Sequence, residues 1–209
     1  MALDLEEQEQ IDELKAWWKQ HGIFVIAVVA TFVIGVSGWK AWQVWTQKQV
    51  GEASVLFERA MQATAGNDAK GVKDLTGQIM ESHARSGYAT PAAWLAGKTN
   101  FNAGDLKSAQ AQYQYALDHA KDPGLEQLAR LRLAVVLVDL KNQDEALKLL
   151  DKPHDAAFVS LYANLKGDIL ALKGQPQAAR AAYKLALEKM DAQSPMKALV
   201  EIKLDGVGG

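Results

Sequence analysis

Side chains that could perform catalysis or hold a metal are few and scattered in this sequence. It contains no cysteine, which excludes thiolate catalysis, disulfide bonds, cysteine-ligated zinc and iron–sulfur clusters. The four histidines have no second histidine or carboxylate at the spacing of a metal site. No glycine-rich loop that could bind phosphate is present. The sequence therefore predicts no catalytic residue, no metal site, no cofactor and no small-molecule substrate, and we expect a protein that is not an enzyme.

The composition indicates a folded helical protein. Of the 209 residues, 49% are hydrophobic and 23% are charged, which argues against extensive disorder. Five prolines and few clusters of β-branched residues favour helices over strands. The formal net charge of −2 gives no indication of nucleic-acid binding. We expect an all-α fold without a nucleic-acid partner.

The elements that must position a functional surface begin with a segment long enough to cross a membrane. Between Lys19 and Lys40, no residue carries a formal charge. A helix of this length spans about 30 Å, the thickness of the hydrocarbon core of a bilayer. Five of the six tryptophans flank the segment, where indole rings favour the membrane interface. We predict a transmembrane helix at 22–39 in a lipid bilayer, with a buried core helix and a cleaved signal peptide as alternatives.

An acidic head precedes the predicted span. Residues 1–21 hold six acidic residues and two lysines, and they form either a solvated helix or a docking segment for a cytosolic partner. Such a head argues against a signal peptide, which usually begins with a short basic segment. Two lysines lie near the span on each side, so charge alone does not decide the orientation in the membrane.

One face of the predicted span carries small residues. Ala27, Thr31 and Gly35 are spaced four apart, and Gly38 lies close to the same stripe. Small side chains allow two helices to approach closely in lipid, so this face is a candidate packing surface for another membrane protein. The alternative is that these are the small residues common in any membrane helix.

A long helix is expected to continue beyond the span, at 40–66. This segment contains no proline, and its one glycine before the end is Gly51. Gly66 and Asn67 are typical of a helix end, and Asp68 is typical of the residue that caps the next helix. One further helix is then predicted at residues 68–87.

The rest of the chain contains an internal repeat. An alanine recurs at nearly regular spacing, at Ala109, Ala146 and Ala179. A small residue before each alanine would let two antiparallel helices touch, and a large residue after it would fill the gap to the next helix pair. The small residues, twelve positions earlier, are Gly97, Ala134 and Gly167, and the large ones, four positions later, are Tyr113, Leu150 and Tyr183.

This pattern resembles the tetratricopeptide repeat, a pair of antiparallel helices. The resemblance implies an array at 67–193, with its best copies at 91–123, 124–155 and 156–193, followed by a capping helix and tail at 194–209. In the middle copy, Lys141 stands where the other copies have glycine, and Pro153 should end the second helix early, near Asp151. Thr90 with Pro91, and Ser194 with Pro195, indicate two helix starts.

In repeats of this type, the first helix of each copy lines a concave groove. Such a groove suits an apolar segment of a partner protein. The alternative is that the chain's own helices, at 40–65 or 195–204, fill the groove. Counted from the aligned alanines, the candidate partner-binding residues are Trp94, Lys98, Phe101, Leu131, Val135, Val138, Asp139 and Asp168.

Taken together, the head, the span, the long helix and the array look like the YfgM family, the ancillary subunit of the bacterial SecYEG translocon. The most similar stretches are 3–22, with Trp17, Trp18 and Gly22, and 109–117. The resemblance implies a single-pass protein of the bacterial inner membrane, with a cytosolic N-terminus and periplasmic repeats. It further implies partnership with SecYEG and the membrane-anchored chaperone PpiD, and transfer of secreted client proteins to periplasmic chaperones. A scaffold of another envelope complex and a signalling anchor of opposite topology are the alternatives.

Overall fold

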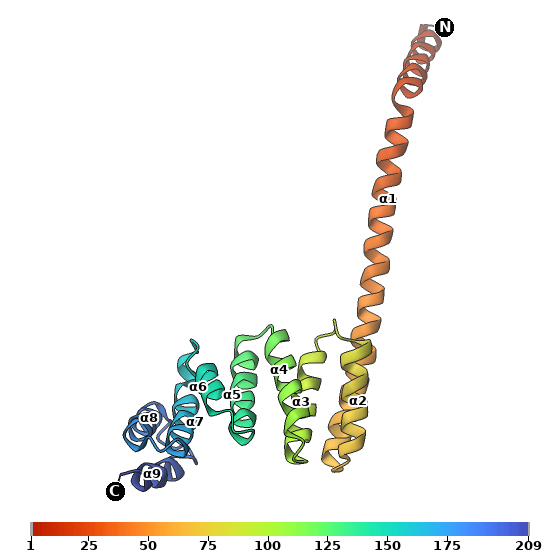
Figure 1. Ribbon diagram of the computed structural model, residues 1–209. Coiled ribbons are helices and arrows are strands. Elements are labelled where there is room, and N and C mark those ends of the chain that lie inside the picture. The colour runs from red at the N-terminus through yellow and green to blue at the C-terminus, as the bar shows by residue number, and fades with distance from the viewer. Residues whose placement is uncertain (1, 209) are drawn as a thin grey trace. The chain divides into compact units, whose positions relative to one another are not determined.

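The computed structural model describes residues 2–208, with side chains from residue 7 onward. Within those residues the chain forms nine α-helices and one 3-10 turn and contains no strand, which confirms the all-α fold class (Figure 1). Met1 of the predicted head and Gly209 of the predicted tail lie outside the described residues. The chain divides into two compact units, residues 1–51 and residues 52–209.

The first unit is helical throughout its described residues and contains the candidate membrane span. It belongs to α1 (Ala2–Ala65), which is long and apolar enough to cross a membrane. Its apolar side chains are open to the surroundings, for example Ile23 at 86% and Phe32 at 71% exposure. A helix with such an uncovered apolar surface is stable in lipid and not in water. The predicted borders at 21/22 and 39/40 fall inside this one helix.

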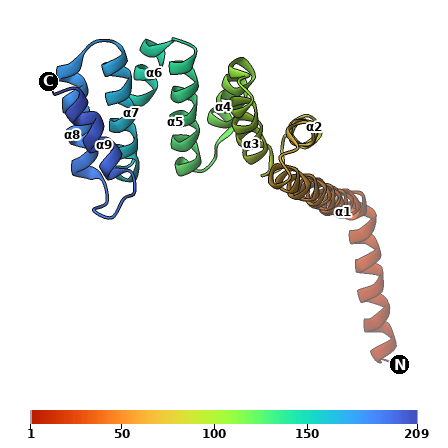
Figure 2. The ribbon, with the colours of Figure 1, turned by 90° about the horizontal axis from the view of Figure 1, so that it is seen from below.

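The second unit is a row of helices that follow one another in chain order (Figures 1 and 2). Each helix packs chiefly on its neighbours in sequence, which is the arrangement of a repeat array. After the last turns of α1, the elements are α2 (Ala69–Ser82), α3 (Ala89–Asn102), α4 (Leu106–His119), α5 (Pro123–Asp139), α6 (Gln143–Leu150), the 3-10 turn η1 (Ala156–Phe158), α7 (Val159–Leu172), α8 (Pro176–Lys189) and α9 (Lys197–Gly206).

The last turns of α1 pack with α2 as the first helix pair of the row. Ala53 and Ala60 are fully buried, in clusters with Ile79 and Val72 of α2. These clusters also contain side chains of α3, so the pair is joined to the following repeats. At the turn between α1 and α2, Asn67 has a φ of 56°, and the Asp68 carboxylate accepts a hydrogen bond from the Gly71 backbone N–H at 2.9 Å. The turn and the cap at Asp68 are therefore as predicted.

Close contact between glycine and tyrosine fixes the helix pairs of the first and third copies. A Cβ added to Gly97 of α3 would lie 2.9 Å from Cε1 of Tyr113 in α4. Gly167 of α7 has the same relation to Tyr183 of α8. These approaches are possible only without a side chain, because interiors are packed to contact distance. The close helix contact predicted at the small residues is therefore confirmed at Gly97 and Gly167, where the large residue that makes the contact belongs to the same helix pair.

The turns between paired helices share one backbone conformation. Gly104 and Gly174 have φ values of 76° and 68°, and Lys141 in the middle copy has a φ of 67°. Lysine is thus held in the left-handed region that favours glycine. The second helix of this copy, α6, ends at Leu150, close to the predicted end near Asp151.

Two helices begin at residues slightly different from the predicted ones. Helix α3 begins at Ala89, before Thr90, and the Thr90 hydroxyl donates to the carbonyl of His119 at 3.2 Å. Helix α9 begins at Lys197, after Ser194, whose Oγ accepts from the Met196 N–H at 3.3 Å. In both cases the hydroxyl bonds elsewhere instead of capping the expected helix.

Candidate functional site

Two adjoining cavities lie along α1, α3 and α5, the first helices of successive helix pairs, where the groove was predicted. We call the first, of about 150 Å³, the basic cavity, and the second, of about 300 Å³, the apolar cavity. Trp94 and Lys98 line both cavities, so the two adjoin across α3. The other residues of the basic cavity are Phe101, Asn102, Tyr113, Arg132, Val135 and Val136, and those of the apolar cavity are Phe57, Met61, Thr64, Thr90, Pro91, Leu95, Ala116, Leu125 and Leu128.

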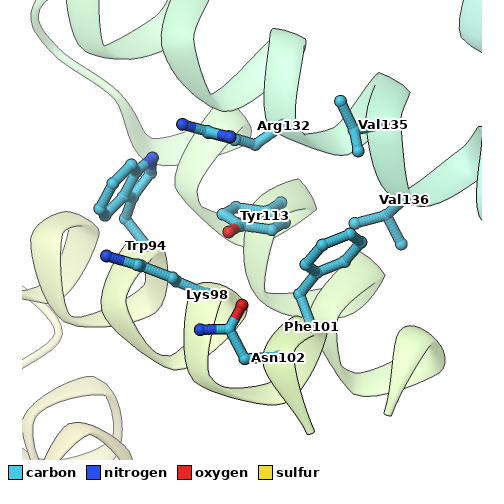
Figure 3. A pocket seen from close by; sticks show the side chains of 8 residues that line it. All are labelled: Trp94, Lys98, Phe101, Asn102, Tyr113, Arg132, Val135 and Val136. Carbon is cyan, nitrogen blue, oxygen red and sulfur yellow. The ribbon is translucent and has the colours of Figure 1, made fainter. Parts of the chain in front are cut away.

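The basic cavity combines a buried phenol with two cations. Figure 3 shows the ring of Tyr113, from α4, between the side chains of Lys98 in α3 and Arg132 in α5. Tyr113 is only 3% exposed, and no residue that the structure describes gives its hydroxyl a hydrogen bond. Burial raises the pKa of this hydroxyl, and the positive charge of Arg132 opposes the rise. The phenol therefore stays protonated and can donate a hydrogen bond.

The apolar cavity is bounded by the last turns of α1 and by α3 and α5, each of which is the first helix of its pair. Phe57 and Met61 come from the last turns of α1, Trp94 from α3, and Leu125 and Leu128 from α5. Met61 and Leu125 are 49% and 45% exposed. The last turns of α1 thus form a wall of the groove and leave space beside them.

Trp94 sits between the two cavities and is half-buried. Its indole Nε1 is buried without a hydrogen-bond partner in the described part of the chain. Tryptophan N–H groups usually find a partner when buried, so this group remains available to an incoming acceptor.

The remaining predicted groove residues line neither cavity. Leu131 and Val138 are half-buried and pack against the core cluster shared by α4, α5, α6 and α7. Asp139 is exposed at the C-terminal end of α5. Of the groove residues that the sequence identified, the structure thus brings four together at the basic cavity: Trp94, Lys98, Phe101 and Val135.

The carboxylate of Asp168 interacts with side chains of α8 and α9. Its carboxylate accepts a hydrogen bond from the Tyr183 hydroxyl at 2.8 Å and lies 2.8 Å from Nζ of Lys203 in α9. The same ammonium group donates to Asn164 at 3.2 Å. Val200 of α9 is fully buried in the cluster with α8. At this end of the array, α9 covers the position that the sequence predicted to face a partner.

The small-residue face of the span has no partner helix among the described residues of this chain. Ala27, Thr31, Gly35 and Gly38 are exposed, and the Thr31 hydroxyl donates to the Ala27 carbonyl at 2.8 Å. A Cβ on Gly35 or Gly38 would meet nothing within 4 Å. Packing of this face against another membrane protein stays a prediction.

Among the residues that the structure describes, no group of three or more histidine, cysteine or acidic side chains could hold a metal ion. Nδ1 of His119 lies 2.9 Å from the backbone carbonyl oxygen of Tyr115, and Nδ1 of His154 lies 2.8 Å from that of Lys152. The two cavities are lined mainly by apolar and aromatic side chains, and Lys98 and Arg132 are the charged residues among them.

Sequence reasoning missed the contributions of Tyr113 and Arg132 to the groove. Tyr113 was identified as a packing residue, but its hydroxyl end lies at the cavity. A signal was present in the repeat alignment, because the residue after the small glycine is Lys98 in the first copy and Asp168 in the third. The charge at this repeat position is thus opposite in the first and third copies.

The chain is similar to known proteins over nearly its whole length. A family model described as a tetratricopeptide repeat-like domain matches residues 15–209. A relative from Neisseria gonorrhoeae is 31% identical over 208 residues, which cover 99% of this chain and 100% of the relative. A relative from Haemophilus influenzae is 30% identical, with coverage of 89% and 91%, and one from Escherichia coli K12 is 26% identical, with coverage of 96% for both chains. All three relatives are named ancillary SecYEG translocon subunit.

Proposed function

Because the chain belongs to the tetratricopeptide repeat-like family that contains the ancillary SecYEG translocon subunits, we propose that it is a membrane-anchored, non-enzymatic subunit of the SecYEG translocon. Its repeat unit binds other proteins through the groove. The observation that carries this proposal is the apolar cavity along α1, α3 and α5, in a chain that also has a candidate membrane span.

The partners follow from this placement. The N-terminal head lies in the cytosol and the repeats lie in the periplasm, where they meet secreted proteins as these leave the translocon. The groove receives apolar segments of such clients or of the membrane-anchored chaperone PpiD, and clients pass on to periplasmic chaperones. Contact with clients is supported by the relatives' name, ancillary SecYEG translocon subunit, together with the apolar cavity on the repeat unit.

The size of the apolar cavity favours short-lived contacts. Its volume of about 300 Å³ accommodates one or two large side chains. Burial of each contributes about 1.5–3 kcal/mol, so the cavity supplies at most about 6 kcal/mol. This is less than the roughly 8 kcal/mol of a micromolar complex, even before the costs of association, so the cavity alone gives weak binding. Transient contact suits a protein that must release its client.

Co-purification of the full chain from gently solubilised membranes tests the proposal. We expect SecYEG subunits and secreted proteins to accompany the wild-type chain. A Met61→Glu and Leu125→Glu double variant should retain SecYEG held through the membrane span but lose secreted proteins, because charged side chains then line the apolar cavity. Leu185→Glu is the matched control, since Leu185 is 41% exposed on α8 and lines neither cavity.

The outcome that would overturn the proposal is the absence of SecYEG from the wild-type complex. Equal recovery of secreted proteins with the double variant and the control would instead show that the groove is not the surface that binds them.

A further inference from the structure

At one groove position, the first and third copies of the repeat carry side chains of opposite charge. In the third copy, the residue after the small glycine is Asp168, held by the hydroxyl of Tyr183 and the ammonium group of Lys203, each at 2.8 Å. A carboxylate is thus bound between a phenol of the second helix and a cation of the following helix. The charges of this trio are satisfied within the chain.

The first copy has the phenol and the cation but no carboxylate. Tyr113 corresponds to Tyr183 in the repeat, and Arg132 of α5 supplies the cation from the following helix. The position of Asp168 is taken by Lys98, which adds a second cation. Neither Lys98 nor Arg132 forms an ion pair with a residue that the structure describes. Figure 3 shows the two side chains extending over the cavity on either side of the Tyr113 ring.

We propose that the basic cavity binds the carboxylate of a glutamate or aspartate side chain in a segment of a partner protein. The carboxylate accepts hydrogen bonds from the Tyr113 hydroxyl and from Lys98 and Arg132, and so takes the place that Asp168 occupies in the third copy. This inference rests on the proposed function, because it specifies which segments the groove recognises.

The apolar cavity determines the rest of the ligand. It adjoins the basic cavity through Trp94 and Lys98, so a bound segment must carry a large apolar residue close to its acidic residue. The basic cavity, at about 150 Å³, has room for a side-chain carboxylate. A free small anion would fill only this cavity and would gain nothing from the apolar one. The combination commits the site to a protein segment of mixed acidic and apolar character.

Paired peptides test the inference on the full chain in detergent micelles. One fluorescent peptide has a central glutamate flanked by leucines, and the other has glutamine at that position. Both have blocked termini, so the glutamate carries the only carboxylate. By fluorescence anisotropy, we expect the glutamate peptide to bind at least ten-fold more tightly at low salt, and this preference to shrink as the salt concentration rises.

Variants identify the groups responsible for the preference. Lys98→Gln and Arg132→Gln should each reduce it several-fold, and Tyr113→Phe should reduce it while keeping the ring that packs on Gly97. Lys184→Gln, at an exposed position of α8 outside both cavities, should leave it unchanged. The helical circular-dichroism spectrum of each variant checks that the fold is retained.

Several results would overturn the inference. Equal affinity for the two peptides, or no binding of either, would show that the cavity does not recognise a carboxylate in a segment. Displacement of the peptide by millimolar free glutamate would assign a small-anion site instead. Self-association that Lys98→Gln abolishes would make a second copy of the chain the occupant. Each of these leaves the proposed function standing if SecYEG and clients still co-purify with the chain.

Discussion

At the scale of single residues, the array depends on two glycines that touch tyrosine rings. The fixed offset between Gly97 and Ala109, repeated in the third copy, predicted close contact between the paired helices, but it did not predict that a tyrosine ring makes this contact. What the sequence did not reveal is the surroundings of the tyrosine hydroxyls. These depend on side chains of the next helix, Arg132 in one copy and Lys203 in the other.

Replacing Gly97 by alanine should destabilise the array. The added Cβ would press on the buried ring of Tyr113, at a cost of about 1–3 kcal/mol, and this exceeds the gain of roughly 1 kcal/mol from better helix propensity. The matched control is Gly77→Ala in α2, where an added Cβ meets nothing within 4 Å. Thermal unfolding of the full chain in detergent should show a lower Tm for the first variant and an equal or higher Tm for the second. Equal Tm values for both variants would show that the contact with Tyr113 is not limiting.

At the scale of elements, the middle copy is the strained one. Its turn places Lys141 at a φ of 67°, where the flanking copies have glycine. The irregularity was visible in sequence as a missing glycine, because a turn between paired helices needs the left-handed conformation whatever residue occupies it. The helix starts at Thr90 and Ser194 were less predictable, since a hydroxyl can cap its own helix or bond to a neighbouring backbone group.

Lys141→Gly should therefore stabilise the chain. Relief of the left-handed conformation is worth about 1 kcal/mol, with part of the gain offset by the larger entropy of glycine in the unfolded chain. Gly174→Ala, at the equivalent turn of the third copy, should have the opposite effect of similar size. Denaturation midpoints of the two variants measure this directly, and a fall in the midpoint for Lys141→Gly would contradict the account of the turn.

At the scale of the whole molecule, the chain combines a candidate membrane span with a repeat unit. Both were predictable because each leaves a regular trace in sequence: an uncharged run between Lys19 and Lys40 for the span, and the recurring alanines at 109, 146 and 179 for the repeats. The shape of the groove was only partly predictable. Its walls come from α1, α3 and α5 together, and at the far end α9 covers Asp168, so its open part depends on packing between copies.

The anchor can be tested by membrane fractionation. The full chain should remain in the membrane pellet after washing with alkaline carbonate, with an intact N-terminus, because the exposed apolar residues of α1 need lipid. Recovery of the protein in the supernatant, or a mature N-terminus near Gly38, would contradict a transmembrane anchor. In spheroplasts, added protease should digest the repeat unit and spare the head, as expected for periplasmic repeats.

The central claim, that the groove is the protein-binding surface, is tested most directly by site-specific photo-crosslinking in living cells. A photoreactive amino acid at Met61, in the wall of the apolar cavity, is compared with the same amino acid at Leu185, which has similar exposure but lies on α8 outside both cavities. The account predicts adducts with secreted proteins or with partners of the translocon from Met61 and few or none from Leu185. Adducts of equal yield from both positions, or adducts from Leu185 alone, would contradict it.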